Sequence, residues 1–184
     1  AEVAIFFTTK RQLGTTKLLF LYLCRMVVAF SGHRAATGVD IDKLKFAIRQ
    51  LYSDGYRTFA SGMAEGFDLL AAQCVIELQR ELEGLKLICV IPFEGHVAKM
   101  STKNRAQYSA ICDAADEVVT LAEDYHKTVY LERNDYLIDR AEALICYYSG
   151  KQRSGTGYTV TKALKKRIRV INIYADGEQI RFFG

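Results

Sequence analysis

Six apolar stretches of strand length recur along this chain with helical patterns between them, and this alternation constrains the fold more than any other feature. The stretches are continuous rather than alternating in polarity, which is typical of strands buried on both faces of a sheet. Strands that alternate with helices at this spacing form right-handed β–α–β units and a parallel sheet. The predicted strands span residues 26–31, 57–61, 85–92, 117–121, 143–148 and 168–174.

The segments between these strands carry apolar residues at helical spacing. The clearest stripe, at residues 41–51, follows Asp40, a suitable N-cap, and stops before Gly55. We therefore predict an α/β fold, a Rossmann-like three-layer sandwich with a mainly parallel sheet of about six strands and helices on both faces. No linker divides residues 26–184, which indicates one domain, closed by a short hairpin at residues 174–183 around Asp176-Gly177.

Residues 1–25 are predicted to be an appendage to this domain. Their apolar stretch, LLFLYLC at residues 18–24, is much shorter than the ~20 residues that a membrane-spanning helix needs, so no membrane partner is expected. Because a strand begins at Met26, translation starting there is the favoured interpretation, which would leave residues 1–25 outside the native product. A genuine additional strand or helix and a targeting signal are the alternatives.

The charge distribution argues against a strongly basic nucleic-acid-binding face. The chain of 184 residues is half hydrophobic and a quarter charged, as in ordinary globular proteins, and its net charge is +4. Most of that excess comes from Lys10, Arg11, Lys17 and Arg25, which are opposed only by Glu2 in the first 26 residues. The remainder of the chain is therefore almost neutral.

The cysteines and histidines do not form a recognisable metal-binding or disulfide pattern. The five cysteines include no CxxC pair, and the three histidines show no ligand spacing. Free cysteines in apolar stretches behave as small buried hydrophobic residues. We expect structural thiols, no metal, and a reducing, cytoplasmic location.

Glycine-bearing turns follow four of the predicted strands. Their sequences are SGHR at 31–34, SGMAEGFD at 61–68, PFEGH at 92–96 and SGKQRSGTG at 149–157. In a parallel sheet these turns gather at the carboxyl edge, where ligands bind near the point at which strand order reverses. Glycine permits close backbone approach and helix N-termini offer free N–H groups, a combination that suits phosphate. Tight packing without a ligand is the alternative for each turn.

Several polar side chains near these turns have both a functional and a structural interpretation. His33 and Arg34 are interpreted as a phosphate clamp, with a solvated surface pair as the alternative. Asp68 could bind a ribose hydroxyl or a base, or only cap the helix that follows it. Arg133 and Asn134 lie on the helix before the fifth strand, where they either face the cleft or are simply exposed.

Three motifs, in this order along the chain, resemble the YpsA-like family. They are SGHR at 31–34, FASGMAEGFDLLAA at 59–72, and the segment 133–173, which contains SGTGYTVT. The family belongs to the SLOG superfamily, which also holds the DNA-processing protein DprA (Smf) and the LOG phosphoribohydrolases. The resemblance covers about residues 26–174. It implies a Rossmann-like fold with a nucleotide-derived ligand at the glycine turns, and it implies no known reaction. The leading hypothesis is a sensor-like domain that binds a nucleotide or an NAD-derived ligand.

Together the turns and the resemblance give a set of predicted ligand-binding residues. The set comprises Ser31, Gly32, His33, Arg34, Ser61, Gly62, Met63, Gly66, Asp68, Pro92, Arg133, Asn134, Gly155, Thr156 and Thr159. A homodimer, formed through exposed helices, is a further expectation.

Two relatives suggest alternative functions. LOG enzymes carry Gly-Gly-x-Gly-Thr-x-x-Glu, which Gly155-Thr156 matches, but Thr159 stands where that motif has Glu. A nucleotide N-glycosidase would therefore need Glu65 or Asp68 as its acid–base group. The likeness to DprA leaves single-stranded DNA as an alternative partner, held by the Lys and Arg side chains of residues 151–169.

Overall fold

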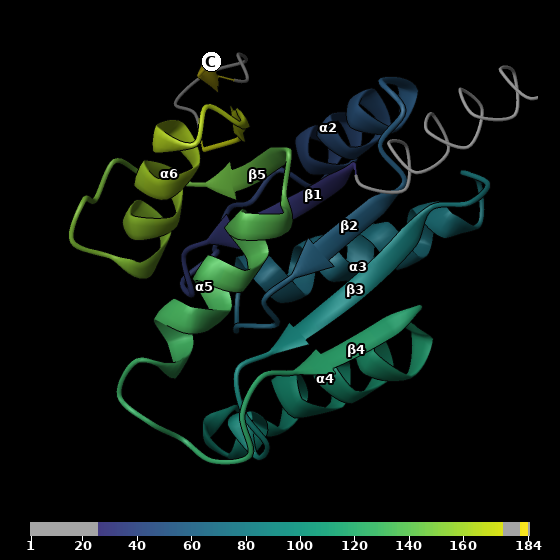
Figure 1. Cartoon of the computed structure of the whole chain (residues 1–184). Coiled ribbons are helices and arrows are strands. Elements are labelled where there is room, and N and C mark those ends of the chain that lie inside the picture. Colours follow the sequence, from purple (N-terminus) through teal and green to yellow (C-terminus); the bar gives the residue numbers. More distant parts are fainter. Residues whose placement is uncertain (1–25, 175–180, 184) are drawn as a thin grey trace, which may run out of the picture.

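The computed structural model describes residues 26–174 and 181–183, in which strands and helices alternate (Figure 1). The strands are β1 (Val27–Gly32), β2 (Thr58–Ser61), β3 (Lys86–Ile91), β4 (Glu117–Thr120), β5 (Ala143–Tyr147), β6 (Arg169–Asn172) and β7 (Arg181–Phe183). The α-helices are α2 (Ile41–Ser53), α3 (Phe67–Gln79), α4 (Thr102–Ala114), α5 (Val129–Arg140) and α6 (Gly155–Lys165). A short 3₁₀ helix, η1, spans His96–Lys99.

All seven strands form one sheet in the order β4-β3-β2-β1-β5-β6-β7. Strands β1 to β6 are parallel, and β7 pairs antiparallel with β6. The predicted α/β class and its six strands are confirmed, with each boundary within two residues of the prediction. The antiparallel partner of β7 is β6, which precedes the predicted hairpin at 174–183, while the predicted turn at Asp176-Gly177 and the predicted appendage at 1–25 lie outside the described residues.

Helices cover both faces of the sheet because successive side chains on each strand point to opposite sides. Val28 and Phe30 of β1 pack in a buried cluster with α2, α3 and α4. Ala29, between them, belongs to a second cluster with α5 and α6. Figure 1 shows this three-layer arrangement, with α5 and α6 on the near side of the sheet.

Two helices begin as their sequences predict. Asp40 accepts a hydrogen bond from the Lys43 amide at 3.0 Å and caps α2. Ser154 accepts one from the Gly157 amide at 3.0 Å and caps α6. Such side-chain caps satisfy amides that lack an intrahelical acceptor, so they fix where each helix starts.

Strand order reverses between β1 and β5. The chain passes from β1 outward to β4 on one side, and from β5 outward to β6 on the other. β1 and β5 are nevertheless neighbours, paired as far as Gly32 and Tyr147 at their carboxyl ends. The connections leave these two ends in opposite directions, which opens a crevice of the kind in which α/β proteins bind ligands.

Candidate functional site

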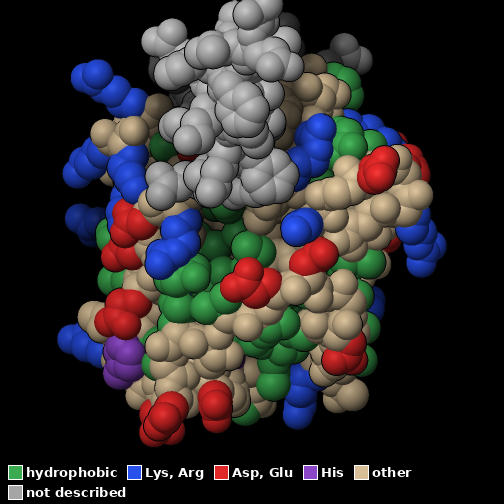
Figure 2. Space-filling view, turned by 45° about the vertical axis from the view of Figure 1, so that its right-hand side comes forward, with side chains coloured by type: hydrophobic (Ala, Val, Ile, Leu, Met, Phe, Trp, Pro, Cys, Tyr) green, Lys and Arg blue, Asp and Glu red, His purple; other side chains and the backbone are tan. Residues whose placement is uncertain are grey.

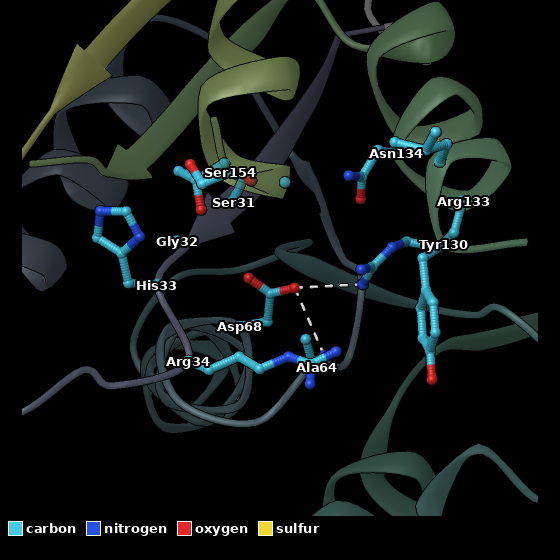
Figure 3. A pocket seen from close by; sticks show the side chains of 13 residues that line it. Ser31, Gly32, His33, Arg34, Ala64, Asp68, Tyr130, Arg133, Asn134 and Ser154 are labelled. Atoms are coloured by element: carbon cyan, nitrogen blue, oxygen red, sulfur yellow. Dashed lines mark hydrogen bonds and ion pairs between the residues drawn. The ribbon is translucent and has the colours of Figure 1, made fainter. Parts of the chain in front are cut away.

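A cavity of about 360 Å³ occupies this crevice. Its walls come from four places: the end of β1, the turn and first residues of α3, the first half of α5, and the start of α6. Figure 3 shows the polar side chains of these elements converging on it. The lining residues are Ser31, Gly32, His33, Arg34, Ala64, Asp68, Tyr130, Leu131, Arg133, Asn134, Ser154, Gly155 and Thr156.

A buried ion pair forms the floor of the cavity. Asp68 and Arg133 are only 5% and 7% exposed, and Nη1 of Arg133 lies 3.4 Å from Oδ2 of Asp68 (Figure 3). The same Nη1 donates a hydrogen bond to the carbonyl of Gly62. Close charge-assisted hydrogen bonds measure about 2.7–2.9 Å, so this pair offsets the loss of hydration only in part.

The protonation of Asp68 follows from this geometry. Burial raises the pKa of Asp68 to about 6, although the charge of Arg133 and a hydrogen bond from the Ala64 amide oppose the increase. Burial also lowers the pKa of Arg133. Near neutral pH the Asp68 carboxyl can therefore exchange a proton, a property that acid–base groups require.

Positive charge exceeds negative charge in the cavity. Arg34 and Arg133 line it together with a single carboxyl group, that of Asp68. Arg34 runs past Asp68 toward Ala64 in Figure 3, and its guanidinium carbon lies 5.8 Å from the centre of the Tyr130 ring. The arrangement favours an anionic ligand.

The start of α6 adds backbone donors to this positive region. Ser154 satisfies the Gly157 amide, but Gly155 and Thr156 occupy the first turn, where N–H groups have no acceptor within the helix. Both residues line the cavity. A helix N-terminus in a cavity that two arginine side chains also line is well suited to a phosphate group.

Gly155 differs from the other glycines of the predicted turns. A Cβ at Gly32, Gly62, Gly66 or Gly157 would lie 2.0–2.5 Å from Phe67, Arg133, Arg34 or Gln152, so internal packing explains why these positions are glycine. A Cβ at Gly155 would meet only Nδ2 of Asn134, at 3.8 Å. The space in front of Gly155 is therefore part of the cavity rather than filled by protein.

The structure brings most of the predicted residues into the cavity. Nine of them line it: Ser31, Gly32, His33, Arg34, Asp68, Arg133, Asn134, Gly155 and Thr156. Six do not: Ser61, Gly62, Met63, Gly66, Pro92 and Thr159.

Two of the residues outside the cavity, Ser61 and Thr159, support its walls. The hydroxyl of Ser61 donates to the carbonyl of Asp68 at 2.9 Å, and it accepts from the Met63 amide. Thr159 is fully buried, and its hydroxyl donates to the carbonyl of Gly155 at 2.9 Å. These contacts hold the first turns of α3 and α6 in place beneath the cavity.

The two candidate carboxyl groups are separated by the fold. Glu65 accepts hydrogen bonds from the Asn104 side chain at 2.9 Å and the Ser101 amide at 3.4 Å, at the start of α4. It does not line the cavity, whereas Asp68 does. Of the two, only Asp68 is positioned to act on a ligand there.

Four lining residues were not among the predicted set: Ala64, Tyr130, Leu131 and Ser154. Tyr130 precedes Arg133 and Asn134 by three and four positions on α5, so all three share one helix face. Helical spacing could have identified Tyr130 from the sequence. Ser154 could have been identified as the residue before Gly155, since serine is a preferred N-cap.

His33 links the two halves of the sheet at one end of the cavity. Its Nε2 accepts a hydrogen bond from the Ser149 amide at 3.0 Å, and the Ser149 hydroxyl lies 2.9 Å from the same atom. Burial, followed by the nearby charge of Lys151, lowers the pKa of His33. The neutral imidazole thus connects the end of β1 to the loop after β5.

A second hollow, of about 220 Å³, lies between α5 and the neighbouring strands and reaches their amino ends at Val27 and Glu117. Val27, Ala60, Ile88, Val90 and Leu137 make most of its lining apolar. Figure 2 shows apolar side chains gathered on the forward face of the molecule below the grey atoms, with acidic and basic groups around them. Arg140 is balanced there by Glu117, and no helix N-terminus is among the described residues that line this hollow, so it does not resemble an anion site.

Comparison with known proteins identifies the family. A sequence model described as the YspA SLOG family (YpsA) matches residues 26–175. The chain belongs to this family. The resemblance inferred from the three motifs is thereby confirmed, and the matched region contains every residue that lines the cavity.

Individual relatives of this YpsA-family chain are more distant. The UPF0398 protein SERP1017 of Staphylococcus epidermidis is 29% identical over 99 residues, which are 50% of this chain and 50% of that protein. The chain thus spans about half the length of this curated relative. Within the part of the chain that the structure describes, no helix is long and apolar enough to cross a membrane.

Two solved structures of DNA processing protein A share the fold. The protein from Streptococcus pneumoniae superposes with a TM-score of 0.58 at 23% identity, over 80% of this chain and 50% of that one. The protein from Helicobacter pylori, whose structure concerns its single-stranded DNA binding mode, gives 0.58 at 21% identity over 79% and 64%. At these identities the likeness concerns the fold.

Proposed function

We propose that this YpsA-family domain binds a nucleotide or a nucleotide-derived small molecule, with its phosphate at the start of α6. The observation that carries the proposal is the open space in front of Gly155, bounded by first-turn amides and facing the arginine side chains of the cavity. The volume of about 360 Å³ is at the lower end of the range for small-molecule sites. Binding without turnover, as in a sensor, is the leading form of the proposal.

A thermal-shift series on the full chain tests this. The ligands are AMP, NAD, ADP-ribose, ribose 5-phosphate and inorganic phosphate. A ligand at 100 times its dissociation constant adds about 2.7 kcal/mol, which corresponds to roughly 5–10 °C for a protein of this size. Gly155→Val fills the space at the first position of α6 and is expected to abolish the shift.

Thr102→Val provides a matched control, because Thr102 also follows a serine N-cap at the start of a helix, α4, and does not line the cavity. This variant should retain the full shift. Absence of a shift with every ligand, or a shift that survives Gly155→Val, would contradict the proposal.

One observation favours a second function, cleavage of a nucleotide N-glycosidic bond. A carboxyl group with a pKa of about 6 lies inside the cavity at Asp68, and it could donate a proton to a departing base. Against this, Thr159, at the position of the LOG glutamate, is fully buried and outside the cavity. Release of free base from a nucleoside monophosphate, lost in Asp68→Asn, is the expected result for this function; no release from any of the common monophosphates excludes it.

Ion pairs within the basic segment 151–169 argue against the alternative function, binding of single-stranded DNA. Lys162 lies 2.7 Å from Asp135 and 3.0 Å from Asp139, and Lys166 lies 3.0 Å from Asp139. These acidic partners neutralise part of the charge that phosphates would need. An oligonucleotide affinity that falls steeply with added salt would restore this alternative.

The proposal extends to the setting of the protein. The described cysteines are free, namely Cys74, Cys89, Cys112 and Cys146, which suits a reducing, cytoplasmic compartment. A homodimer remains a prediction, for which light scattering on the purified chain is the direct measurement.

A further inference from the structure

Three aromatic rings from separate segments meet beside the cavity. Phe93 follows β3, Tyr125 follows β4, and Tyr130 lies in the first turn of α5. Their ring centres are 5.6 Å (Phe93–Tyr125), 6.0 Å (Phe93–Tyr130) and 6.2 Å (Tyr125–Tyr130) apart. We call these three residues the aromatic platform.

The aromatic platform is supported from below and exposed above. The ring of His96, itself buried, lies 5.8 Å from Phe93 and 5.9 Å from Tyr130. His96 Nε2 is 3.2 Å from the carbonyl of Met63, and burial lowers the pKa of this histidine, so a neutral ring braces the platform. On the outer side, Tyr125 is 62% exposed. Burial in the core therefore does not account for the position of Tyr125.

The aromatic platform is continuous with the proposed phosphate site. Tyr130 lines the cavity, and the Arg34 guanidinium lies 5.8 Å from its ring centre. Figure 3 shows the Tyr130 ring next to the Arg133 guanidinium, away from the start of α6. A planar guanidinium beside an aromatic ring offers a second surface on which a flat group can stack.

One side chain of α5 lies between the two regions. Asn134 is the side chain nearest to the open position at Gly155. It follows Tyr130 by four residues on α5, a rise of about 6 Å along the helix axis. A ribose beside Asn134 would therefore join a phosphate at α6 to a base at Tyr130.

We infer that the aromatic platform is the base-binding subsite of the nucleotide site, where a planar nucleobase stacks on Tyr130 and contacts Tyr125, whose ring is tilted by 56° from that of Tyr130. This inference rests on the proposed function, and it adds that the ligand carries an aromatic base and that the base is held by stacking. Because every base has a π-face, purines and pyrimidines are both accepted.

The test compares two ligands that differ only in the base, AMP and ribose 5-phosphate, by calorimetric titration of the full chain. Stacking on an aromatic side chain is expected to make AMP bind at least about tenfold more tightly. Tyr125→Ala should reduce that ratio and leave the affinity for ribose 5-phosphate unchanged, since Tyr125 does not line the cavity. Phe46→Ala removes a comparably exposed aromatic residue from α2 (53%) and should leave the ratio intact.

The outcomes of these titrations distinguish the phosphate site from the base subsite. If both ligands bind with equal affinity, or if the ratio is unchanged in both Tyr125→Ala and Tyr130→Leu, the base subsite is refuted while the phosphate site stands. If neither ligand binds the unmodified chain, the phosphate site and the base subsite are both refuted. Circular dichroism of each variant verifies that it is folded.

Discussion

At the Asp68–Arg133 pair, burial and the arginine charge act in opposite directions on the pKa of Asp68. The pH dependence of the free energy of unfolding shows which of the two is larger. Removal from water favours the neutral carboxyl, whereas the guanidinium favours the carboxylate. The fold raises the pKa of Asp68 from 3.8 to about 6, so the folded chain binds this proton more tightly than the unfolded chain does. Stability from this group is therefore fully present below pH 3.8 and is lost as pH rises toward 6.

The expected size of this loss follows from the shift in pKa. Each unit is worth about 1.4 kcal/mol, so about two units amount to roughly 3 kcal/mol between pH 4 and pH 7. For a protein of this size that is roughly 6–12 °C in Tm. Asp68→Asn removes the titrating group, and the difference between variant and unmodified chain cancels the contributions of all other carboxyl groups.

Urea denaturation of both proteins at several pH values from 4 to 8 measures this difference. The unmodified chain should lose about 3 kcal/mol relative to Asp68→Asn over that interval, with a plateau above pH 7. A difference that is independent of pH would show that Asp68 does not titrate as argued. A difference of the opposite sign would show that attraction to Arg133 outweighs burial.

Further predictions concern packing and binding. Gly62→Ala places a Cβ against Nη1 of Arg133 and should lower the free energy of unfolding by about 1–3 kcal/mol. Gly155→Ala should leave the free energy of unfolding unchanged or raise it, because the space there is open. Equal effects of the two variants in denaturation experiments would contradict the distinction between these glycines. Phe30→Ala, in a fully buried cluster with Phe59 and Phe67, should cost about 3–5 kcal/mol by the same measurement, and a cost below 1 kcal/mol would refute this packing. Arg34→Gln should weaken AMP by roughly tenfold in calorimetry, because it removes one of the two arginine charges that line the cavity; an unchanged affinity for AMP would refute a role of Arg34 in binding.

The sheet and its helices could be predicted because each depends on local patterns. The continuous apolar run in β5 is fully buried as its sequence suggests, and Asp40 and Gly55 bound α2 as expected. The strand order could not be derived from the same patterns. It arises from which crossovers pack on which face, and several orders satisfy the same alternation of strands and helices.

The composition of the site was only partly predictable, for a related reason. Asp68 and Glu65 stand three residues apart in one turn, and the direction in which α3 leaves that turn sends the first to the cavity and the second to α4. The pairing of Asp68 with Arg133 joins residues 65 positions apart. Sequence likewise concealed the neutralisation of Lys162 by Asp135, because it depends on the packing of α5 against α6.

The hydrogen bond between His33 and Ser149 suggests that ligand binding would change the dynamics of segments distant from the cavity. It crosses the seam at which the β1–β4 half of the sheet meets the β5–β7 half. Residues of both halves line the cavity, so a bound ligand would contact both and link them across that seam. Amide hydrogens of α3 and of α6, on opposite faces of the sheet, should then exchange more slowly together when the ligand is present. Ligand binding would thus reduce local opening in the helix layers on both faces of the sheet.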